Sequence, residues 1–310
     1  MHGFLVILPV ALVVAAGWML GRKGTVSSEA FAQINQALYW VVFPALIFRM
    51  TATADMSAFF DRNMVLAVYV SFLTAPPLAW LASKLSGDKP ARSGASALMV
   101  IRSSTVFMGL PVITVAVGMR GVEVLSIYLA FTFIGCQVLS ILWAQLSLSG
   151  GISGRPLLGT AFSLARNPLI VSSIGGFSLA LLGFSGFPLW LDETLKLLGN
   201  VGSGMALLSL GASIKFRGLP QMLARAWRDT AFKLLFYPAL LWMLLTLWPV
   251  SPVVFQTVIL IAAMPASVDC FILSHVLGMD SGHAAATITA TTILSGLTVP
   301  LWISLLAAFS

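Results

Sequence analysis

Long apolar segments separated by short polar breaks run through almost the whole of this sequence. Each is about 20 residues long, which is enough for an α-helix to cross a hydrocarbon layer roughly 30 Å thick. Only 9% of the 310 residues are charged and 59% are hydrophobic, whereas about a quarter of the residues of a soluble domain are charged. The sequence therefore predicts an all-α polytopic membrane protein of about ten transmembrane helices in a lipid bilayer. The segments cover residues 3–20, 34–50, 63–82, 94–117, 122–147, 164–182, 195–214, 231–248, 253–277 and 284–308.

The positive charges are distributed unevenly between the two sides of the predicted membrane. By the positive-inside rule the breaks that hold most of them are cytoplasmic, so both termini are predicted to be extracytoplasmic. The net charge of +7 is thus explained by topology, because the basic residues form no stripe with interleaved aromatic residues that would suit a nucleic acid. The cytoplasmic group consists of Arg22, Lys23, Lys84, Lys89, Arg92, Arg155, Arg166, Lys215, Arg217, Arg225, Arg228 and Lys233.

A faint internal repeat relates the two halves of the chain. An offset of 161 residues places Ala45–Ile47 on Ala206–Leu208 and Pro77 on Pro238. Because five spans is an odd number, a second copy of a five-helix unit must insert with the opposite orientation. The sequence therefore predicts two inverted five-helix repeats joined by a cytoplasmic linker that contains glycines. The first repeat, the linker and the second repeat cover residues 1–148, 149–160 and 161–310.

Two charged residues lie deep inside the predicted spans. Arg102 is in the fourth span and Asp269, the only acidic residue in such a position, is in the ninth. A charge at the centre of a spanning helix costs about 2.5 to 3.5 kcal/mol, so it persists where pairing or function compensates. Two interpretations stay open: the two residues serve substrate binding and coupling, or they form a structural ion pair. The histidines His275 and His283 are predicted to be interfacial.

The same two spans contain helix breakers beside hydroxyl residues. Proline removes a backbone donor, and lipid cannot satisfy the groups that a broken helix leaves unpaired. If two broken helices cross near the midplane, the positive ends of their half-helices favour an anion there. We therefore predict a carboxylate site, beside which Asp269 binds a coupling H⁺ or Na⁺. The predicted substrate-binding residues are Arg102, Ser103, Ser104, Thr105, Gly109, Pro111, Pro265 and Ser267.

Four short segments resemble the auxin efflux carrier family of membrane transporters. They are Thr105–Pro111, Asn167–Ile170, Ala206–Gly211 and Ala263–Pro265. The resemblance implies two inverted repeats with broken, crossing helices 4 and 9, and a transport domain that moves against a scaffold as an elevator. It also implies an organic anion as substrate and makes a homodimer plausible. Bacterial members include malonate and other dicarboxylate carriers, so a bacterial inner membrane is the expected location.

These observations predict a secondary active transporter of a small organic anion, either a mono- or dicarboxylate or an auxin-like acid. An enzyme is not expected, because the sequence has no HExxH, GxSxG or nucleotide-binding motif. No metal or other cofactor is expected, because Cys136 and Cys270 lie inside apolar segments. A passive organic-anion channel or uniporter is the alternative. Ser104 stands where the family commonly has Asn, and Asn is frequent near the position of Asp269, so the substrate and coupling ion stay open.

Overall fold

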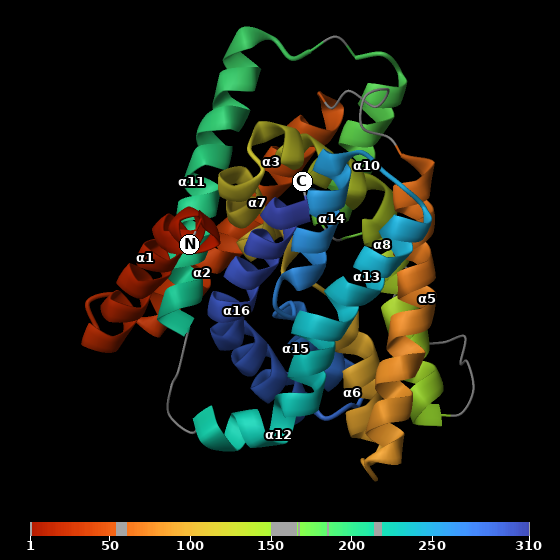
Figure 1. Cartoon of the computed structure of the whole chain (residues 1–310). Helices are drawn as coiled ribbons and strands as arrows, with labels where there is room; N and C mark the ends of the chain where they lie inside the picture. Colours follow the sequence, from red (N-terminus) through yellow and green to blue (C-terminus); the bar gives the residue numbers. More distant parts are fainter. Residues whose placement is uncertain are drawn as a thin grey trace. The chain divides into compact units, whose positions relative to one another are not determined.

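The structure, a computed structural model, describes residues 2–53, 61–149, 166, 168–184, 186–213 and 219–309. Within these ranges every regular element is a helix, and the one β contact is an isolated bridge between Ser103 and Ala266. The all-α prediction is therefore confirmed (Figure 1). Except for Ser149, the predicted linker lies outside the described residues, as does the C-terminal Ser310.

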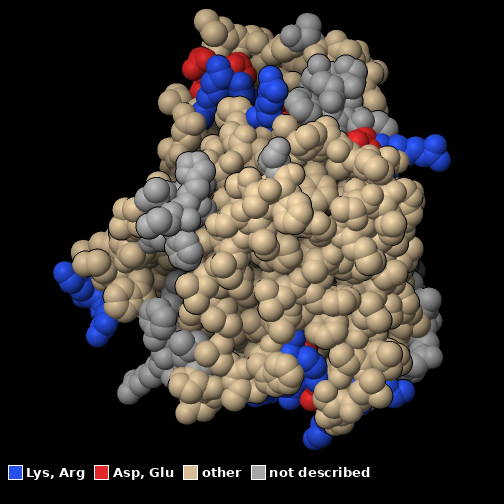
Figure 2. All heavy atoms as spheres, in the orientation of Figure 1, with Lys and Arg blue, Asp and Glu red and all other residues tan. Residues whose placement is uncertain are grey.

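Several helices are long and apolar enough to cross a membrane. A bent pair, Met119–Thr132 and Gly135–Leu148, meets at 51° and adds a further span if the two are counted together. Most of the surface visible in Figure 2 carries neither acidic nor basic side chains, as contact with lipid requires. A multi-pass membrane protein is thus confirmed, whereas the total of ten spans and the inverted repeat stay predictions. Among the described residues the four unbent spans are Glu29–Ala52, Arg62–Leu85, Pro220–Leu247 and Ser281–Phe309.

The chain divides into two compact units, and each takes segments from both sides of the predicted linker. The compact units therefore do not coincide with the predicted repeats, and the boundaries of the repeats stay predictions. Unit 1 comprises Met1–Phe60, Val106–Phe131 and Ser163–Ile214. Unit 2 comprises Asp61–Thr105, Thr132–Phe162 and Lys215–Ser310.

Unit 1 is held together by close helix contacts at glycines. A Cβ on Gly17 would lie 2.0 Å from the carbonyl oxygen of Leu208, and one on Gly211 would lie 1.9 Å from that of Val14. Helix backbones approach this closely only where a side chain is missing, as in membrane helices that pack through small residues. The elements are α1 (His2–Lys23), α2 (Ser28–Ala37), η1 (Leu38–Val42), α3 (Phe43–Ala52), α7 (Leu110–Ala116), the first part of α8 (Met119–Ser149), α10 (Pro168–Leu181) and α11 (Leu189–Ser213).

Unit 2 contains the interrupted helices. In it α6 packs against α5, α15 and α16, while α14 packs against α13 and α16. Its elements are α5 (Arg62–Leu85), α6 (Pro90–Val100), the rest of α8, α12 (Leu219–Ala231), η3 (Phe232–Phe236), α13 (Tyr237–Leu247), α14 (Pro252–Ala263), α15 (Asp269–Val276) and α16 (Ser281–Phe309). An apolar core of unit 2 is formed by Ala95, Leu98, Met99, Ile141, Ala144, Ala266, Cys270, Met279 and Ala284.

A wide helical turn, η3, joins α12 to α13 within one continuous span. The N–H of Tyr237 bonds to the carbonyl of Phe232, five residues back, and Pro238 follows directly. A wide turn of this kind accommodates a proline, which lacks an N–H and whose ring would clash with the carbonyl four residues earlier. The same arrangement, η1, precedes Pro44 in unit 1. In unit 2 this turn carries Lys233, which bears on the functional site below.

Candidate functional site

The helix interruptions predicted in the fourth and ninth spans are both present, and they bond to each other. The first separates α6 from η2 (Thr105–Gly109) at residues 101–104, and the second separates α14 from α15 at residues 264–268. The N–H of Ser104 donates to the carbonyl of Pro265 at 2.8 Å, and a second bond of 3.0 Å runs from the second interruption back to the first. These bonds satisfy backbone groups that lipid would leave unpaired. We call the two interruptions together the crossing.

Arg102 lies at the crossing and is almost fully buried, with 4% of its surface exposed. One guanidinium nitrogen, Nη1, donates to the hydroxyl of Ser140 at 3.0 Å, and Nη2 donates to the carboxylate of Asp269. The remaining nitrogen, Nε, and the Oδ1 atom of Asp269 are both buried, and neither has a hydrogen-bond partner among the described residues. The Asp269 side chain is 42% exposed. The ion pair between these two residues is thus present, and their part in substrate binding and coupling stays a prediction.

The predicted hydroxyl residues differ in exposure. Ser104 is buried, whereas Ser103, Thr105 and Ser267 are partly exposed. The N–H of Ser267 supplies the second bond of the crossing by donating to the carbonyl of Arg102, and the Thr105 hydroxyl donates to the carbonyl of Ser103 at 3.2 Å. Unit 2 therefore brings together the predicted residues Arg102, Ser103, Ser104, Thr105, Pro265, Ser267 and Asp269.

Gly109 and Pro111 do not form the interruption, contrary to the prediction. Gly109 has helical backbone angles, φ −62° and ψ −49°, and Pro111 lies in the first turn of α7. Pro111 follows the wide turn η2 as Pro44 follows η1 and Pro238 follows η3, so the helix Thr105–Ala116 accommodates the proline without a break. Both residues belong to unit 1. The predicted position of the break at Gly109 and Pro111 is therefore wrong, whereas a contact of these two residues with the substrate stays a prediction.

Lys233, which lies in η3, contacts the crossing, whereas the sequence interpretation assigned it to the cytoplasmic charges. Only 1% of its surface is exposed. Its ammonium donates to the carbonyl of Val100 at 3.1 Å and to the hydroxyl of Ser103 at 2.6 Å, and it lies 4.6 Å from the ring centre of Tyr237. The sequence did contain a signal for this residue: Lys233 lies inside the predicted span 231–248. Placing a lysine in the membrane costs as much free energy as placing an arginine there.

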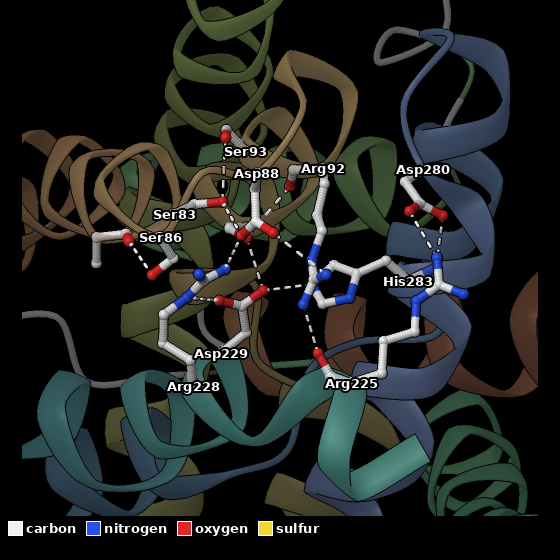
Figure 3. Close-up of polar contacts among 12 residues, drawn as sticks. Ser83, Ser86, Asp88, Arg92, Ser93, Arg225, Arg228, Asp229, Asp280 and His283 are labelled. Atoms are coloured by element: carbon white, nitrogen blue, oxygen red, sulfur yellow. Dashed lines mark hydrogen bonds and ion pairs between the residues drawn. The ribbon is translucent and has the colours of Figure 1, made fainter. Parts of the chain in front are cut away.

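A second buried polar group joins α6, α12 and α16. The imidazole Nε2 of His283 lies 2.5 Å from a carboxylate oxygen of Asp229, and the hydroxyl of Ser96 donates to the same oxygen at 2.6 Å. Figure 3 shows this carboxylate between His283 and Arg228. His283 is completely buried and Asp229 is 5% exposed. His283 thus bonds to a carboxylate inside the protein, and its interfacial position stays a prediction. Asp229 is a second acidic residue within a candidate span, Pro220–Leu247.

Further ion pairs extend this group toward the ends of the helices. Arg228 pairs with Asp88 at 2.7 Å, and Arg225 pairs with Asp280 at 2.7 Å. Burial raises the pKa of Asp88, but hydrogen bonds from Ser83 and Arg228 and nearby arginine charges outweigh it, so this pKa lies below its ordinary value. We call the following residues the polar cluster: Ser83, Asp88, Arg92, Ser93, Ser96, Arg225, Arg228, Asp229, Asp280 and His283 (Figure 3).

A hollow in unit 1 is lined by apolar residues that include Leu46, Met50 and Leu129. The one hydroxyl in its lining belongs to Ser126, which donates to the carbonyl of Val122 at 2.9 Å. The lining therefore offers no charged group to a carboxylate. The charged residue predicted to bind the anion, Arg102, lies instead at the crossing in unit 2.

Comparison with known proteins identifies the family. The chain matches a family model described as "Membrane transport protein" over residues 2–151 and 157–303. A "Putative malonate transporter" of Rhizobium meliloti is 24% identical, with 94% of this chain and 92% of the relative covered. An "Uncharacterized transporter" of Methanothermobacter thermautotrophicus is 24% identical with 96% of both chains covered, and the "Uncharacterized transporter YfdV" of Escherichia coli K12 is 21% identical with 96% and 95% covered. The chain therefore belongs to the auxin efflux carrier family of membrane transporters.

Proposed function

We propose that this protein is a secondary active transporter that moves a small mono- or dicarboxylate across the membrane. The observation that carries the proposal is a buried arginine at the bonded crossing of two interrupted helices. Sites of this kind in transporters use helix ends and freed backbone groups to bind ions near the middle of the membrane. The similarity to a "Putative malonate transporter" supports a carboxylate as the substrate.

The ion pair of Arg102 and Asp269 suggests how binding proceeds. A substrate carboxylate is the same chemical group as the Asp269 side chain, so it competes for the planar donors of the guanidinium. Asp269 is the more exposed partner of the pair, and it is the one that moves away. When the substrate is a dicarboxylate, the released carboxylate then takes up H⁺ or Na⁺, because an uncompensated charge within the membrane is costly. In this proposal anion binding and ion binding favour each other.

The division of the chain supports an elevator mechanism. Both compact units combine segments from the two sides of residues 149–160, as expected when repeats interlock to form a scaffold and a moving domain. The proposal includes a bacterial inner membrane location, extracytoplasmic termini and a homodimer. These details rest on the charge distribution and the family resemblance. A passive organic-anion channel or uniporter is the competing function.

Counterflow of malonate in proteoliposomes tests the proposal. A carrier exchanges labelled external malonate for unlabelled internal malonate with saturation, whereas a channel gives no such exchange. Arg102→Lys keeps the charge but loses the planar fork, so we expect the KM for malonate to rise at least tenfold. Arg120→Lys is the matched control because Arg120 is exposed. Absence of counterflow with any mono- or dicarboxylate contradicts the proposed function, and an unchanged KM removes Arg102 from the site.

A further inference from the structure

Lys233 has no assigned part in the function above, although its ammonium lies at the crossing. We infer that Lys233 acts through the hydroxyl of Ser103 to form a second anion-binding point for the substrate carboxylate. The inference rests on the proposed function in that it names a positioning residue for the same site. It differs in its residues, because Arg102 and Asp269 take no part in this contact.

The environment of Lys233 lacks the negative charge that a buried ammonium requires. Its contacts are the carbonyl of Val100, the hydroxyl of Ser103 and the ring of Tyr237. In the part of the chain that the structure describes, no carboxylate forms a salt bridge with it. Burying a charge without an ionic partner is expensive. An anionic ligand next to Ser103 supplies the missing charge, which gives this buried lysine a functional reason to persist.

The direction of the hydrogen bond prepares Ser103 to bind an anion. An ammonium can only donate, so in the 2.6 Å contact the oxygen of Ser103 accepts. The hydroxyl hydrogen therefore points to another group, and no acceptor for it is present among the described residues. Lys233 is buried while Ser103 is partly exposed, so the hydroxyl is the part of this pair that a ligand reaches. The positive charge behind the oxygen strengthens the donor, as in other charge-assisted contacts.

The backbone fixes the position of this hydroxyl. Ser103 is the residue that forms the antiparallel bridge with Ala266, and the carbonyl of Ser103 accepts bonds from the Thr105 amide and hydroxyl. Lys233 also bonds to Val100, the last residue of α6. A rigid donor costs less entropy on binding than a mobile one. Lys233 thus both polarises the hydroxyl and ties η3 to the first interruption.

Binding of malonate to the purified full-length protein provides the test. Ser103→Ala and Lys233→Met are each expected to raise the Kd about tenfold, the effect of losing one hydrogen bond to a charged group. If Lys233 acts through Ser103, the Kd of the double variant is only slightly higher than that of whichever single variant binds malonate less tightly. Lys233→Arg is expected to keep the affinity within a few-fold because the charge remains. Lys89→Met is the matched control, since Lys89 is exposed in the loop before α6.

The outcomes separate this inference from the proposed function. Losses that multiply to about a hundredfold in the double variant overturn the inference, because the two residues then act independently. An unchanged Kd with a lower melting temperature in Lys233→Met also overturns it and assigns Lys233 a structural role. If counterflow occurs and neither substitution changes the Kd for malonate, the inference is wrong and the proposed transport function is retained. Malonate binding that depends on Lys233, without any counterflow, supports the inference and contradicts the transporter.

Discussion

Asp269→Asn separates substrate binding from ion coupling with a minimal change of shape. In the structure the Asp269 carboxylate accepts a hydrogen bond from Arg102, and a substrate has to displace it. Asparagine keeps a carbonyl oxygen that still accepts from the guanidinium but has no charge and cannot be protonated under these conditions. The variant should therefore bind the anion more easily and lose the link to an ion gradient.

The size of both effects follows from the contact. A charge-assisted hydrogen bond is roughly twice as strong as a neutral one, so displacing the side chain becomes cheaper by about 1 kcal/mol. Malonate should then bind roughly fivefold more tightly. A gradient of one pH unit provides about 1.4 kcal/mol per proton, which supports roughly tenfold accumulation by a carrier that couples one proton to one substrate. For Asp269→Asn the expected accumulation ratio is close to one.

Proteoliposomes allow both quantities to be measured on the same preparation. Malonate counterflow without a gradient reports exchange, and uptake under a separate proton or sodium gradient reports accumulation. Glu193→Gln is the control, because Glu193 is exposed and lies in α11 of unit 1. Accumulation equal to that of the parent refutes the role of Asp269 in coupling. Loss of folding together with exchange instead identifies the ion pair as structural.

Three further substitutions test the packing and the polar cluster. Gly211→Leu places a side chain where the Cβ would lie 1.9 Å from a carbonyl oxygen. Thermal denaturation in detergent should therefore show a free energy of unfolding lower by about 1 to 3 kcal/mol. Gly204→Leu is the control and should show no such loss, because nothing lies within 4 Å of a Cβ at that position. Asp229→Asn removes the buried carboxylate that contacts His283 and one of the two carboxylates that pair with Arg228, and chemical denaturation should show a loss of about 3 kcal/mol. Asp88 has a lowered pKa in the folded protein, so its stabilisation is complete above its unfolded pKa of about 3.9 and is lost as the pH falls through the folded pKa. The stability difference between the parent and Asp88→Asn should therefore be constant from pH 6 to 8 and shrink below about pH 4.

The sequence was sufficient to predict the helical membrane fold, and it offered an ion pair of Arg102 with Asp269 as one of two interpretations. Both predictions depend on the high cost of charge in lipid, which acts on each residue regardless of its distant neighbours. The interruption at Pro265 was also predictable, because a proline within a span removes a backbone donor. Pro111 misled for the same reason: it follows the wide turn η2, and a turn of this kind accommodates a proline without an interruption. The effect of a proline depends on whether a wide turn precedes it, and the local sequence did not reveal this.

The polar cluster was missed because its partners are distant in the chain. Asp229 follows Arg225 and Arg228, so the segment reads as a cytoplasmic loop. The structure instead makes it part of α12 and buries the carboxylate against His283, 54 residues later. A periodic apolar pattern predicts a buried helix face, but it does not identify which polar groups meet there. Lys233 was misassigned for the same reason, since its hydrogen-bond partners lie 130 and 133 residues away.

The charges of unit 2 link the substrate to its coupling ion. In the polar cluster three arginines balance three carboxylates: Arg92, Arg225 and Arg228 with Asp88, Asp229 and Asp280. At the crossing, Arg102 and a protonated Lys233 face the single carboxylate of Asp269, and this set of charges has an excess of one positive charge. A monocarboxylate neutralises this excess, whereas a dicarboxylate requires one more cation, which Asp269 supplies by binding H⁺ or Na⁺. Because moving net charge through lipid is costly, the ion requirement should follow the substrate charge. Malonate uptake should therefore carry one more H⁺ or Na⁺ per molecule than acetate uptake, and equal ion stoichiometry for the two would contradict this charge balance.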